Sequence, residues 1–315
     1  MKYSIVFALL LSVVSTMYSA VQPIAIDRFL AVRSIPTTVD VKTMVYRGVF
    51  NDCHMFVDLK DNAIFLLDMD SLELKAKYFF RFGRFDGEVE SLRMTAHHGN
   101  RLWVLDQFNR VTLFEHGDNK FIFKATFFLT PYVLVTNMYA SHLGLFAFGR
   151  DTDGVFHLNR YNEVGTKIDD IKTFKPPMPG NLILSHDYNG NLFYSFQFQA
   201  IIHHLTIDKK KTTTYKPDFA IRWSVEKNEM YKNGMVYNIG ELGPSHLFIS
   251  YWTVPTGGLF SIIEKKSKKV IASYTYPLAE GFLYKDRIYI YNESFQDKNM
   301  QSFLIELRAN DIIKK

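Results

Sequence analysis

Short apolar runs separated by turn-forming residues repeat along the chain, and the clearest example extends from Gly99 to Phe127. Within it, Leu102–Leu105, Val111–Phe114 and Phe121–Phe127 are mainly apolar, and Asp, Asn and Gly residues stand between them. Runs of this length with turn residues between them predict the strands of an antiparallel meander. The abundance of Phe (28) and Tyr (18) also favours strands over helices.

The apolar run Leu102–Leu105 is followed by a turn-forming break, Asp106–Asn109, and similar apolar runs recur through the chain. The equivalent runs start at Met55, Leu102, Leu145, Leu192, Leu247 and Ile288. A hairpin pattern follows each of them, at Phe65–Phe80, Val111–Phe127, Val155–Ile171, Ile201–Lys216, Leu259–Tyr274 and Phe303–Lys315. Spacings of about 41–55 residues match one four-stranded propeller blade per unit. The pattern therefore predicts an all-β, six-bladed β-propeller of four-stranded antiparallel blades.

The two ends of the repeat array are irregular. The sixth unit has little room for a fourth strand, whereas Pro23–Leu30 forms a spare β-like run near the N-terminus. We expect this run to form the outer edge of the final blade, which would close the ring and cover an open strand edge. The spacing between the runs at Leu192 and Leu247 is the longest, which places an insertion between Lys216 and Gly234.

The N-terminal segment has the pattern of a secretory signal peptide. Lys2 precedes an apolar run from Ile5 to Val14, and small residues follow it. Cleavage after Ala20 and cleavage after Ser15 both fit the pattern. We therefore expect a signal peptide over residues 1–20 and a single propeller domain over 21–315. The protein would be secreted or periplasmic, with no lipid-modified cysteine and no transmembrane segment.

Composition narrows the class of protein. A hydrophobic content of 47% and an aromatic content of 16% are typical of a packed globular domain. Cys53 is the only cysteine, which excludes a disulfide framework and a cysteine metal site; we expect it to be a small apolar residue of the first blade. The net charge of +5 is weaker than that of a dedicated nucleic-acid-binding domain.

One stretch resembles a known repeat. The segment from Gly99 to Val111, GNRLWVLDQFNRV, resembles the core of an NHL-type repeat, and Gly190–Tyr194 repeats its first half. The chain as a whole resembles the six-bladed β-propellers of the NHL/TolB-like group, especially their exported bacterial members. The usual Pro-x-Gly-Ile start is replaced by Ser91–Ala96. The resemblance implies the fold, but it does not select a function, because this architecture serves binding modules and enzymes alike.

A propeller blade places its connections on two faces. We name the A–B face after the turns between first and second strands, and the B–C face after the turns between second and third strands and the links between blades. Propellers in general often bind ligands on the second of these. The candidate ligand-binding residues on the B–C face are Arg150, Tyr251, Trp252, Asp106, Arg110 and Asp58. Asp58 and Asp106 can alternatively serve only to bond turn amides.

The A–B face carries most of the histidines, namely His97, His98, His142, His186 and His246. Their offsets from the following strand differ, and no pair has the usual metal-ligand spacing on one strand. We interpret them as turn residues. The partner expected from the sequence is a protein, peptide or glycan, without nucleic acid, bound by a monomeric propeller.

An enzymatic alternative stays open at this stage. Some propellers hold Ca²⁺ at the central channel, and calcium prefers several oxygen ligands. Glu90, Asn181 and Glu280 lie near predicted inner strands and are the candidate metal ligands. They would support a calcium-dependent, lactonase-like hydrolase. We favour the first function, a non-enzymatic binding propeller that needs no cofactor.

Overall fold

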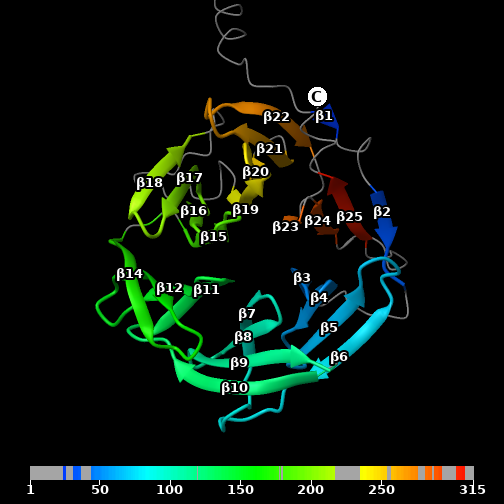
Figure 1. Cartoon of the computed structure of the whole chain (residues 1–315), viewed down its shortest axis with the longest axis vertical. Coiled ribbons are helices and arrows are strands. Elements are labelled where there is room, and N and C mark those ends of the chain that lie inside the picture. The colour runs from blue at the N-terminus through cyan, green and yellow to red at the C-terminus, as the bar shows by residue number, and fades with distance from the viewer. Residues whose placement is uncertain are drawn as a thin grey trace, which may run out of the picture.

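The computed structural model describes residues 24–25, 31–36, 44–118, 120–176, 178, 180–216, 235–253, 257–275, 281–285, 287–292 and 303–308. Every regular element in these ranges is a β-strand. The strands form six sheets arranged around a central opening (Figure 1). The expected signal peptide and nearly all of the insertion before Gly234 lie outside the described residues. No helix in the described ranges is long and apolar enough to cross a membrane.

The first three sheets are four-stranded and antiparallel, and each is built from strands consecutive in the chain. The first consists of β3 (Val45–Phe50), β4 (Cys53–Asp58), β5 (Ala63–Asp68) and β6 (Leu74–Phe79). The second consists of β7 (Leu92–His98), β8 (Arg101–Asp106), β9 (Arg110–Gly117) and β10 (Lys120–Phe128). The third consists of β11 (Leu134–Ser141), β12 (Gly144–Arg150), β13 (Phe156–Tyr161) and β14 (Lys167–Phe174).

The consecutive strands of the remaining sheets are also antiparallel, and two of these sheets include a strand from the N-terminal region. The fourth consists of β15 (Leu182–His186), β16 (Leu192–Phe196), β17 (Gln199–Thr206) and β18 (Lys211–Tyr215). The fifth consists of β19 (Met235–Leu242), β20 (His246–Thr253), β21 (Gly257–Glu264), β22 (Val270–Thr275) and β1 (Ile24–Ala25). The sixth consists of β23 (Gly281–Tyr284), β24 (Arg287–Asn292), β25 (Phe303–Arg308) and β2 (Ala31–Ser34).

The first strands of the sheets surround the central axis. Each contacts the first strands of both neighbouring sheets, and the cycle closes where β23 contacts β3. The apolar runs that mark the repeat in the sequence all lie in the second strands of their sheets, β4, β8, β12, β16, β20 and β24. The chain is therefore an all-β propeller of four-stranded antiparallel blades (Figure 1).

The N-terminal strand differs from the expectation. The strand that pairs antiparallel with β25 is β2, from Ala31 to Ser34, rather than the predicted run Pro23–Leu30. Within that run, Ile24–Ala25 instead lies parallel to β22 of the neighbouring sheet. The pairing register, with Ala31 opposite Glu306 and Ser34 opposite Phe303, places the outer strand further along the chain than the apolar pattern suggests.

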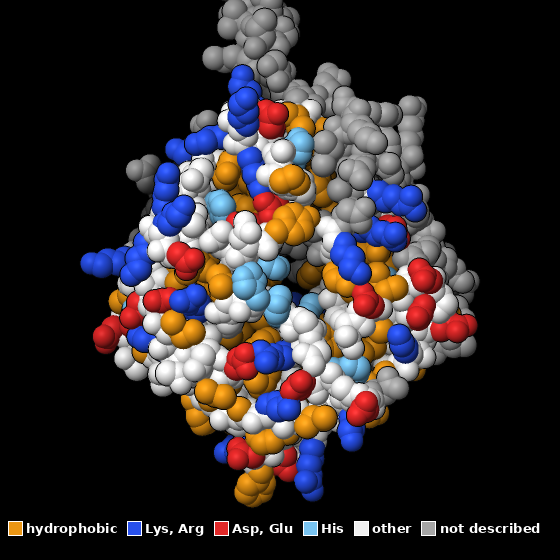
Figure 2. Space-filling model, in the orientation of Figure 1, with side chains coloured by type: hydrophobic (Ala, Val, Ile, Leu, Met, Phe, Trp, Pro, Cys, Tyr) orange, Lys and Arg blue, Asp and Glu red, His pale blue; other side chains and the backbone are white. Residues whose placement is uncertain are grey.

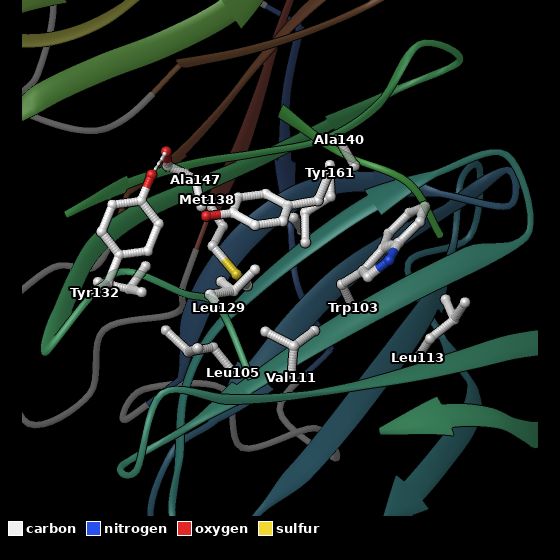
Figure 3. Close-up of a cluster of buried hydrophobic side chains, with 13 residues drawn as sticks. Trp103, Leu105, Val111, Leu113, Leu129, Tyr132, Met138, Ala140, Ala147 and Tyr161 are labelled. Atoms are coloured by element: carbon white, nitrogen blue, oxygen red, sulfur yellow. Dashed lines mark hydrogen bonds between the residues drawn. The ribbon is translucent and has the colours of Figure 1, made fainter. Parts of the chain in front are cut away.

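The hydrophobic core is divided into clusters that lie between neighbouring sheets. One cluster joins Trp103 and Leu105 of β8 to Met138 of β11 and to Tyr132 and Tyr161 (Figure 3). The Tyr132 hydroxyl donates a hydrogen bond of 2.7 Å to the Ala147 carbonyl, so its polar end is satisfied within the core. Because strand side chains alternate between the two faces of a sheet, a sheet covered on both faces buries nearly all of them.

Strand β4 shows this double burial most clearly, because every one of its residues is buried. Cys53, at its start, belongs to the apolar cluster between the first and second sheets. Its burial agrees with the expected role of a small apolar residue. The outer strands β6, β10 and β14 are mostly exposed, in keeping with their place at the rim.

Truncation of a side chain in these clusters should destabilise the fold. We expect Trp103→Ala to lower the free energy of unfolding by about 3–5 kcal/mol, because it removes a large buried ring and leaves a cavity. Ile168→Ala, at a position of β14 that is 47% exposed, should change it by less than about 0.5 kcal/mol. Urea unfolding followed by far-UV circular dichroism measures the free energy of unfolding of each variant. Equal effects of the two substitutions would contradict the burial of Trp103.

Candidate functional site

The link between β6 and β7 carries exposed phenylalanines at the rim of the propeller (cyan in Figure 1). We call residues 80–91 the aromatic link. Its two ends are anchored, since Phe80 and Val89 are buried in the cluster between the first and second sheets. The Val89 amide donates to the Arg81 carbonyl at 2.8 Å and closes the loop. Phe82 and Phe85, between these anchors, are 69% and 80% exposed.

Asn62, in the turn between β4 and β5, holds the base of the aromatic link. The Asn62 side-chain amide donates to the Val89 carbonyl at 3.2 Å. Its side-chain oxygen accepts from the Leu92 amide at 2.7 Å, and its backbone carbonyl accepts from the Phe80 amide at 2.9 Å. These bonds fix both ends of the link to one buried residue.

Arg110 holds the middle of the aromatic link. Its guanidinium donates to the carbonyls of Gly83 at 2.7 Å and Glu88 at 3.2 Å, and also to the Arg84 carbonyl. The same guanidinium forms an ion pair of 2.8 Å with Asp106, whose other carboxylate oxygen accepts from the Phe108 amide. Asp106 and Arg110 are 1% and 5% exposed, so they position the link and do not offer their charges to a surface ligand.

Further apolar side chains continue the exposed surface of the link on the B–C face. The guanidinium carbon of Arg84 lies 4.4 Å from the ring centre of Phe108, a cation–π contact. Asn109, the next residue of that turn, donates to the Val133 carbonyl at 2.7 Å. We define the aromatic patch as the exposed residues Phe82, Phe85, Phe108, Phe128 and Val133.

Both arginines of the aromatic link are paired with carboxylates of the same link. Arg84 forms an ion pair with Glu90, and Arg81 lies 3.4 Å from Glu88. The hydrogen bond from Arg84 lowers the pKa of the Glu90 carboxyl, which stays ionised. Glu90, a candidate calcium ligand, is therefore already bonded to a cation of its own link.

Of the other two candidate metal ligands, Asn181 belongs to the described part of the chain. Asn181 is exposed in the link before β15, where its carbonyl accepts from the Gln197 amide at 2.8 Å. Glu280 lies outside the described residues. In the described part of the chain, no three or more His, Cys, Asp or Glu side chains are grouped to hold a metal ion. The calcium site remains a prediction from the sequence.

The remaining candidate ligand-binding residues fall into different environments. Asp58 accepts from the amides of Lys60 (2.9 Å) and Asp61 (3.0 Å), so it caps its turn. Tyr251 is 2% exposed, and its hydroxyl lies 2.9 Å from the Ser261 hydroxyl. Burial raises the pKa of Tyr251 to about 12, and the side chain belongs to the core rather than to a ligand surface.

Two of these candidates remain beside the B–C face. Arg150 is exposed at the end of β12. The backbone of Trp252 lies in β20, opposite Met235, and its side chain is outside what the structure describes. Their contact role stays a prediction.

A separate site, which is concave, lies on the A–B face. A cavity of about 500 Å³, which we call the channel cavity, is lined by residues of β3, β7, β11, β15, β19 and β23. Figure 2 shows histidine side chains gathered at the centre of this face, beside a hollow. The ring centres of His98 and His142 are 6.1 Å apart, and those of His98 and His186 are 6.4 Å apart.

Polar side chains beside the channel cavity join neighbouring sheets. His97 of β7 donates from Nε2 to the Arg47 carbonyl of β3 at 3.1 Å. His186 of β15 contacts the Tyr139 hydroxyl of β11 through Nδ1. Each of these histidines therefore bonds to the first strand of the preceding sheet.

Glu241 occupies the corresponding place in the fifth sheet. It lies opposite Leu247, as His97 lies opposite Leu102 and His186 opposite Leu192. Its carboxylate accepts from the Tyr188 amide at 2.7 Å, again from the preceding sheet. The positions of neighbouring sheets around the central axis are thus fixed here by side-chain hydrogen bonds as well as by apolar packing.

Three histidines beside the channel cavity, His97, His98 and His186, have lowered pKa values and are therefore uncharged at neutral pH. Burial lowers the pKa of His97 and of His98, and it lowers the pKa of His186 to about 4. For His98 and His186, the other histidines add to the effect, because neighbouring positive charges disfavour protonation. The channel cavity therefore presents neutral imidazoles.

Sequence reasoning placed these histidines on the A–B face but did not bring them together. The turn after His98 has two residues, whereas five residues separate His186 from β16, so their offsets from the next strand differ. Pairing register would have shown the equivalence of His97 and His186. The aromatic patch was also missed, although two phenylalanines three residues apart, Phe82 and Phe85, in a link otherwise rich in charge and glycine were a usable signal.

No protein-family model matches this chain, and no curated protein is similar to it in sequence. The solved structures that resemble it share little sequence. A protein from Bacteroides fragilis that is named as exported has a TM-score of 0.58 and 12% identity, over 90% of this chain and 96% of its own. A luciferin-regenerating enzyme has a TM-score of 0.55 and 11% identity, over 89% and 95%.

The β-propeller domain of Cps50 (Swd1) from Myceliophteria thermophila has a TM-score of 0.51 and 11% identity, over 89% of this chain and 99% of that domain. These similarities support the propeller fold. Membership of the NHL/TolB-like group stays a prediction, and structures of such different function do not select one for this chain.

Removal of Arg110 should release the aromatic link. Arg110→Met leaves the Asp106 carboxylate buried without its partner, which should lower the free energy of unfolding by about 3–5 kcal/mol. Trypsin should also cut after Arg81 and Arg84 faster than in the parent protein. The double variant Asp106→Asn/Arg110→Met keeps the turn acceptor without the buried charge and should recover part of the loss. An unchanged free energy of unfolding and cleavage rate in Arg110→Met would show that the clamp has no structural effect.

Acid should destabilise the protein through its buried histidines. His186 has a pKa of about 4 in the folded chain and a pKa of 6.5 without burial, so the unfolded chain takes up the proton first as the pH falls. The free energy of unfolding should therefore decrease between about pH 6.5 and pH 4. His186→Gln should reduce this slope by up to about 1.4 kcal/mol per pH unit. Urea midpoints at several pH values measure the slope, and an identical slope in the variant would contradict the burial of this imidazole.

Proposed function

We propose that this protein is an exported, non-enzymatic β-propeller that binds a protein partner through its B–C face. The observation that carries the proposal is the aromatic patch, two of whose phenylalanines lie on a link that a buried arginine holds in place. Phe82 and Phe85 lose little water contact on folding, since they are 69% and 80% exposed, and exposed apolar side chains gathered on one surface mark interaction sites. A link fixed before binding loses little conformational entropy when a partner docks.

The chemistry of the patch favours a protein over the other partners expected from the sequence. Aromatic and arginine side chains are enriched among the residues that contribute most to protein–protein binding. A glycan would need hydrogen-bonding groups, which phenyl rings lack. The aromatic link carries two arginines against three acidic residues, so it has no excess positive charge that would attract an anionic lipid surface.

Export is supported by the signal-peptide pattern and by the name of the B. fragilis structure that this fold resembles. One of the similar structures is a luciferin-regenerating enzyme, so this fold also occurs in enzymes. The calcium-dependent hydrolase remains a prediction from the sequence, since Glu280 lies outside the described residues.

The test is site-specific crosslinking. A photoreactive phenylalanine analogue at position 85 should crosslink one defined protein from the exported fraction of the native cells. The same analogue at position 168, an exposed apolar position of β14, is the matched control. The proposal predicts an adduct at position 85 that is absent at position 168, because only the first position lies in the aromatic patch.

Replacement of the two exposed phenylalanines of the aromatic link gives a second measurement. Phe82→Ser/Phe85→Ser should weaken binding of the protein captured at position 85 by tenfold or more, because anchor residues of an interface each contribute about 2 kcal/mol or more. The free energy of unfolding should stay unchanged, since both rings are exposed. Equal affinity of the variant and the parent protein, or the same adducts at both crosslinking positions, would reject the aromatic patch as the binding surface.

A further inference from the structure

We propose that this propeller docks on anionic phospholipid membranes through two lysine-rich connections of its A–B face. We call these connections the lysine turns. They are residues 208–211, where β17 turns into β18, and residues 264–269, where β21 turns into β22. The aromatic patch lies on the B–C face, so this proposal does not rest on the function proposed above.

Both lysine turns lie on the A–B face, in neighbouring sheets. The Ile207 amide donates to the side-chain oxygen of Asn191, in the turn between β15 and β16, at 3.2 Å. The Lys265 amide donates to the Ser245 carbonyl, in the turn between β19 and β20, at 2.8 Å. Figure 2 shows Lys and Arg side chains along the upper left edge of this face, where Figure 1 places β17, β18 and β22. One flat surface can therefore contact both turns.

The lysine turns carry an excess of positive charge. They contain seven lysines and two acidic residues, Asp208 and Glu264. Lys265 is paired with Glu241. The other six lysines are exposed, and within the described part of the chain none of them forms an ion pair with a carboxylate: Lys209, Lys210, Lys211, Lys266, Lys268 and Lys269.

Neighbouring acidic side chains do not cancel this excess, because they already have partners. Asp187, in the turn between β15 and β16, is 5% exposed and lies 2.9 Å from His204. In the third sheet each acidic side chain near the corresponding connection has a basic partner: Glu163 with Arg101, Asp169 with Arg160 and Asp170 with Lys167.

The backbone of the turns does not call for lysine. The connections between the third and fourth strands of the first five sheets each contain a residue with a positive φ angle: Leu72, Asp118, Gly165, Lys210 and Lys268. Glycine and aspartate suit this conformation, and the Leu72 side chain is buried in the core. Lys210 and Lys268, with φ of 49° and 61°, have neither advantage. Their strained conformation indicates that the charge itself is useful at these positions.

Solubility does not call for lysine either. The connections between the third and fourth strands of the first three sheets, residues 69–73, 118–119 and 162–166, contain no lysine in their sequence. Acidic residues keep these turns in water instead, namely Asp70, Glu73, Asp118 and Glu163. The lysines are therefore confined to one sector of the ring.

The composition of the lysine turns favours a membrane over a protein partner. They contain no apolar or aromatic residue, whereas protein interfaces depend on such anchors. They also contain no arginine, the residue whose planar group suits directional recognition of a phosphate or carboxylate. Lysines act as flexible point charges, and an anionic bilayer attracts them by charge alone. Docking on this face would leave the aromatic patch free for a partner.

The experiment is cosedimentation of the protein, purified after export, with vesicles. Vesicles of phosphatidylcholine are the neutral probe, and vesicles with equal amounts of phosphatidylcholine and phosphatidylglycerol are the anionic probe. The protein should bind only the anionic vesicles at an ionic strength of about 0.1 M. It should leave them at about 1 M, where the Debye length falls from about 10 Å to about 3 Å.

A double variant tests the lysine turns directly. Lys210→Asn/Lys268→Asn removes one charge from each turn and places a residue that tolerates a positive φ. It should weaken binding to anionic vesicles by about 25-fold, because one lysine near such a surface contributes about fivefold. The free energy of unfolding should stay the same or rise, whereas a purely structural role of these lysines would lower it.

The matched control removes the same charge from the opposite face. Lys60→Asn/Lys175→Asn, at exposed positions of two connections on the B–C face, should leave vesicle binding within about twofold of the parent protein. Equal binding by the two double variants, or equal binding to neutral and anionic vesicles, would overturn the proposal.

Two further results would assign the binding elsewhere and would also overturn it. The first is saturable binding of soluble polygalacturonate without any binding of anionic vesicles, which would assign the lysine turns to an anionic polysaccharide. The second is loss of vesicle binding in Phe82→Ser/Phe85→Ser, which would assign the membrane contact to the aromatic patch. Failure of the crosslinking at position 85 would leave the membrane proposal unaffected, because it concerns the other face.

Discussion

Each sheet of this propeller buries its apolar side chains only because neighbouring sheets cover them. The hydrophobic clusters lie between sheets, and β4 is buried along its whole length. A single sheet could not be stable alone with two apolar faces in water. The contacts between first strands, which close from β23 to β3, are therefore the condition for the stability of every sheet.

Polar side chains at the two ends of the strands define the positions of the sheets more exactly than apolar packing can. On the B–C face, Asp106 and Arg110 fix the link that joins two sheets. On the A–B face, His97 and His186 bond to the preceding sheet. Hydrogen bonds are directional, whereas apolar contacts tolerate sliding. The aromatic patch and the channel cavity both lie beside these polar contacts.

The sequence allowed the strands and their antiparallel order to be predicted, because apolar runs and turn residues are local signals. The edge strand β2 was misplaced, since an outer strand has one neighbour and few residues that specify its register. Tyr251 was expected at a ligand surface because it precedes a turn. In a sheet buried on both faces, apolar alternation no longer distinguishes an inward from an outward side chain, and Tyr251 belongs to the core.

The candidate sites were less predictable than the fold. The role of Arg110 depends on carbonyl groups of a link 22 to 27 residues earlier in the chain, which no local pattern reveals. The grouping of His98 with His142 and His186 depends on how three sheets pack around an axis. Exposure of Phe82 and Phe85 follows from the anchoring of Phe80 and Val89 on either side, which requires the tertiary structure.

The burial of Cys53 has a consequence for how the molecule can be observed. This thiol lies at the junction of the first and second sheets, and its surroundings raise its pKa, so the intact protein keeps it in the unreactive thiol form. Labelling reagents gain access when that junction opens. Because the chain has no other cysteine, the rate of its alkylation reports a single event, the separation of two adjacent sheets of the ring.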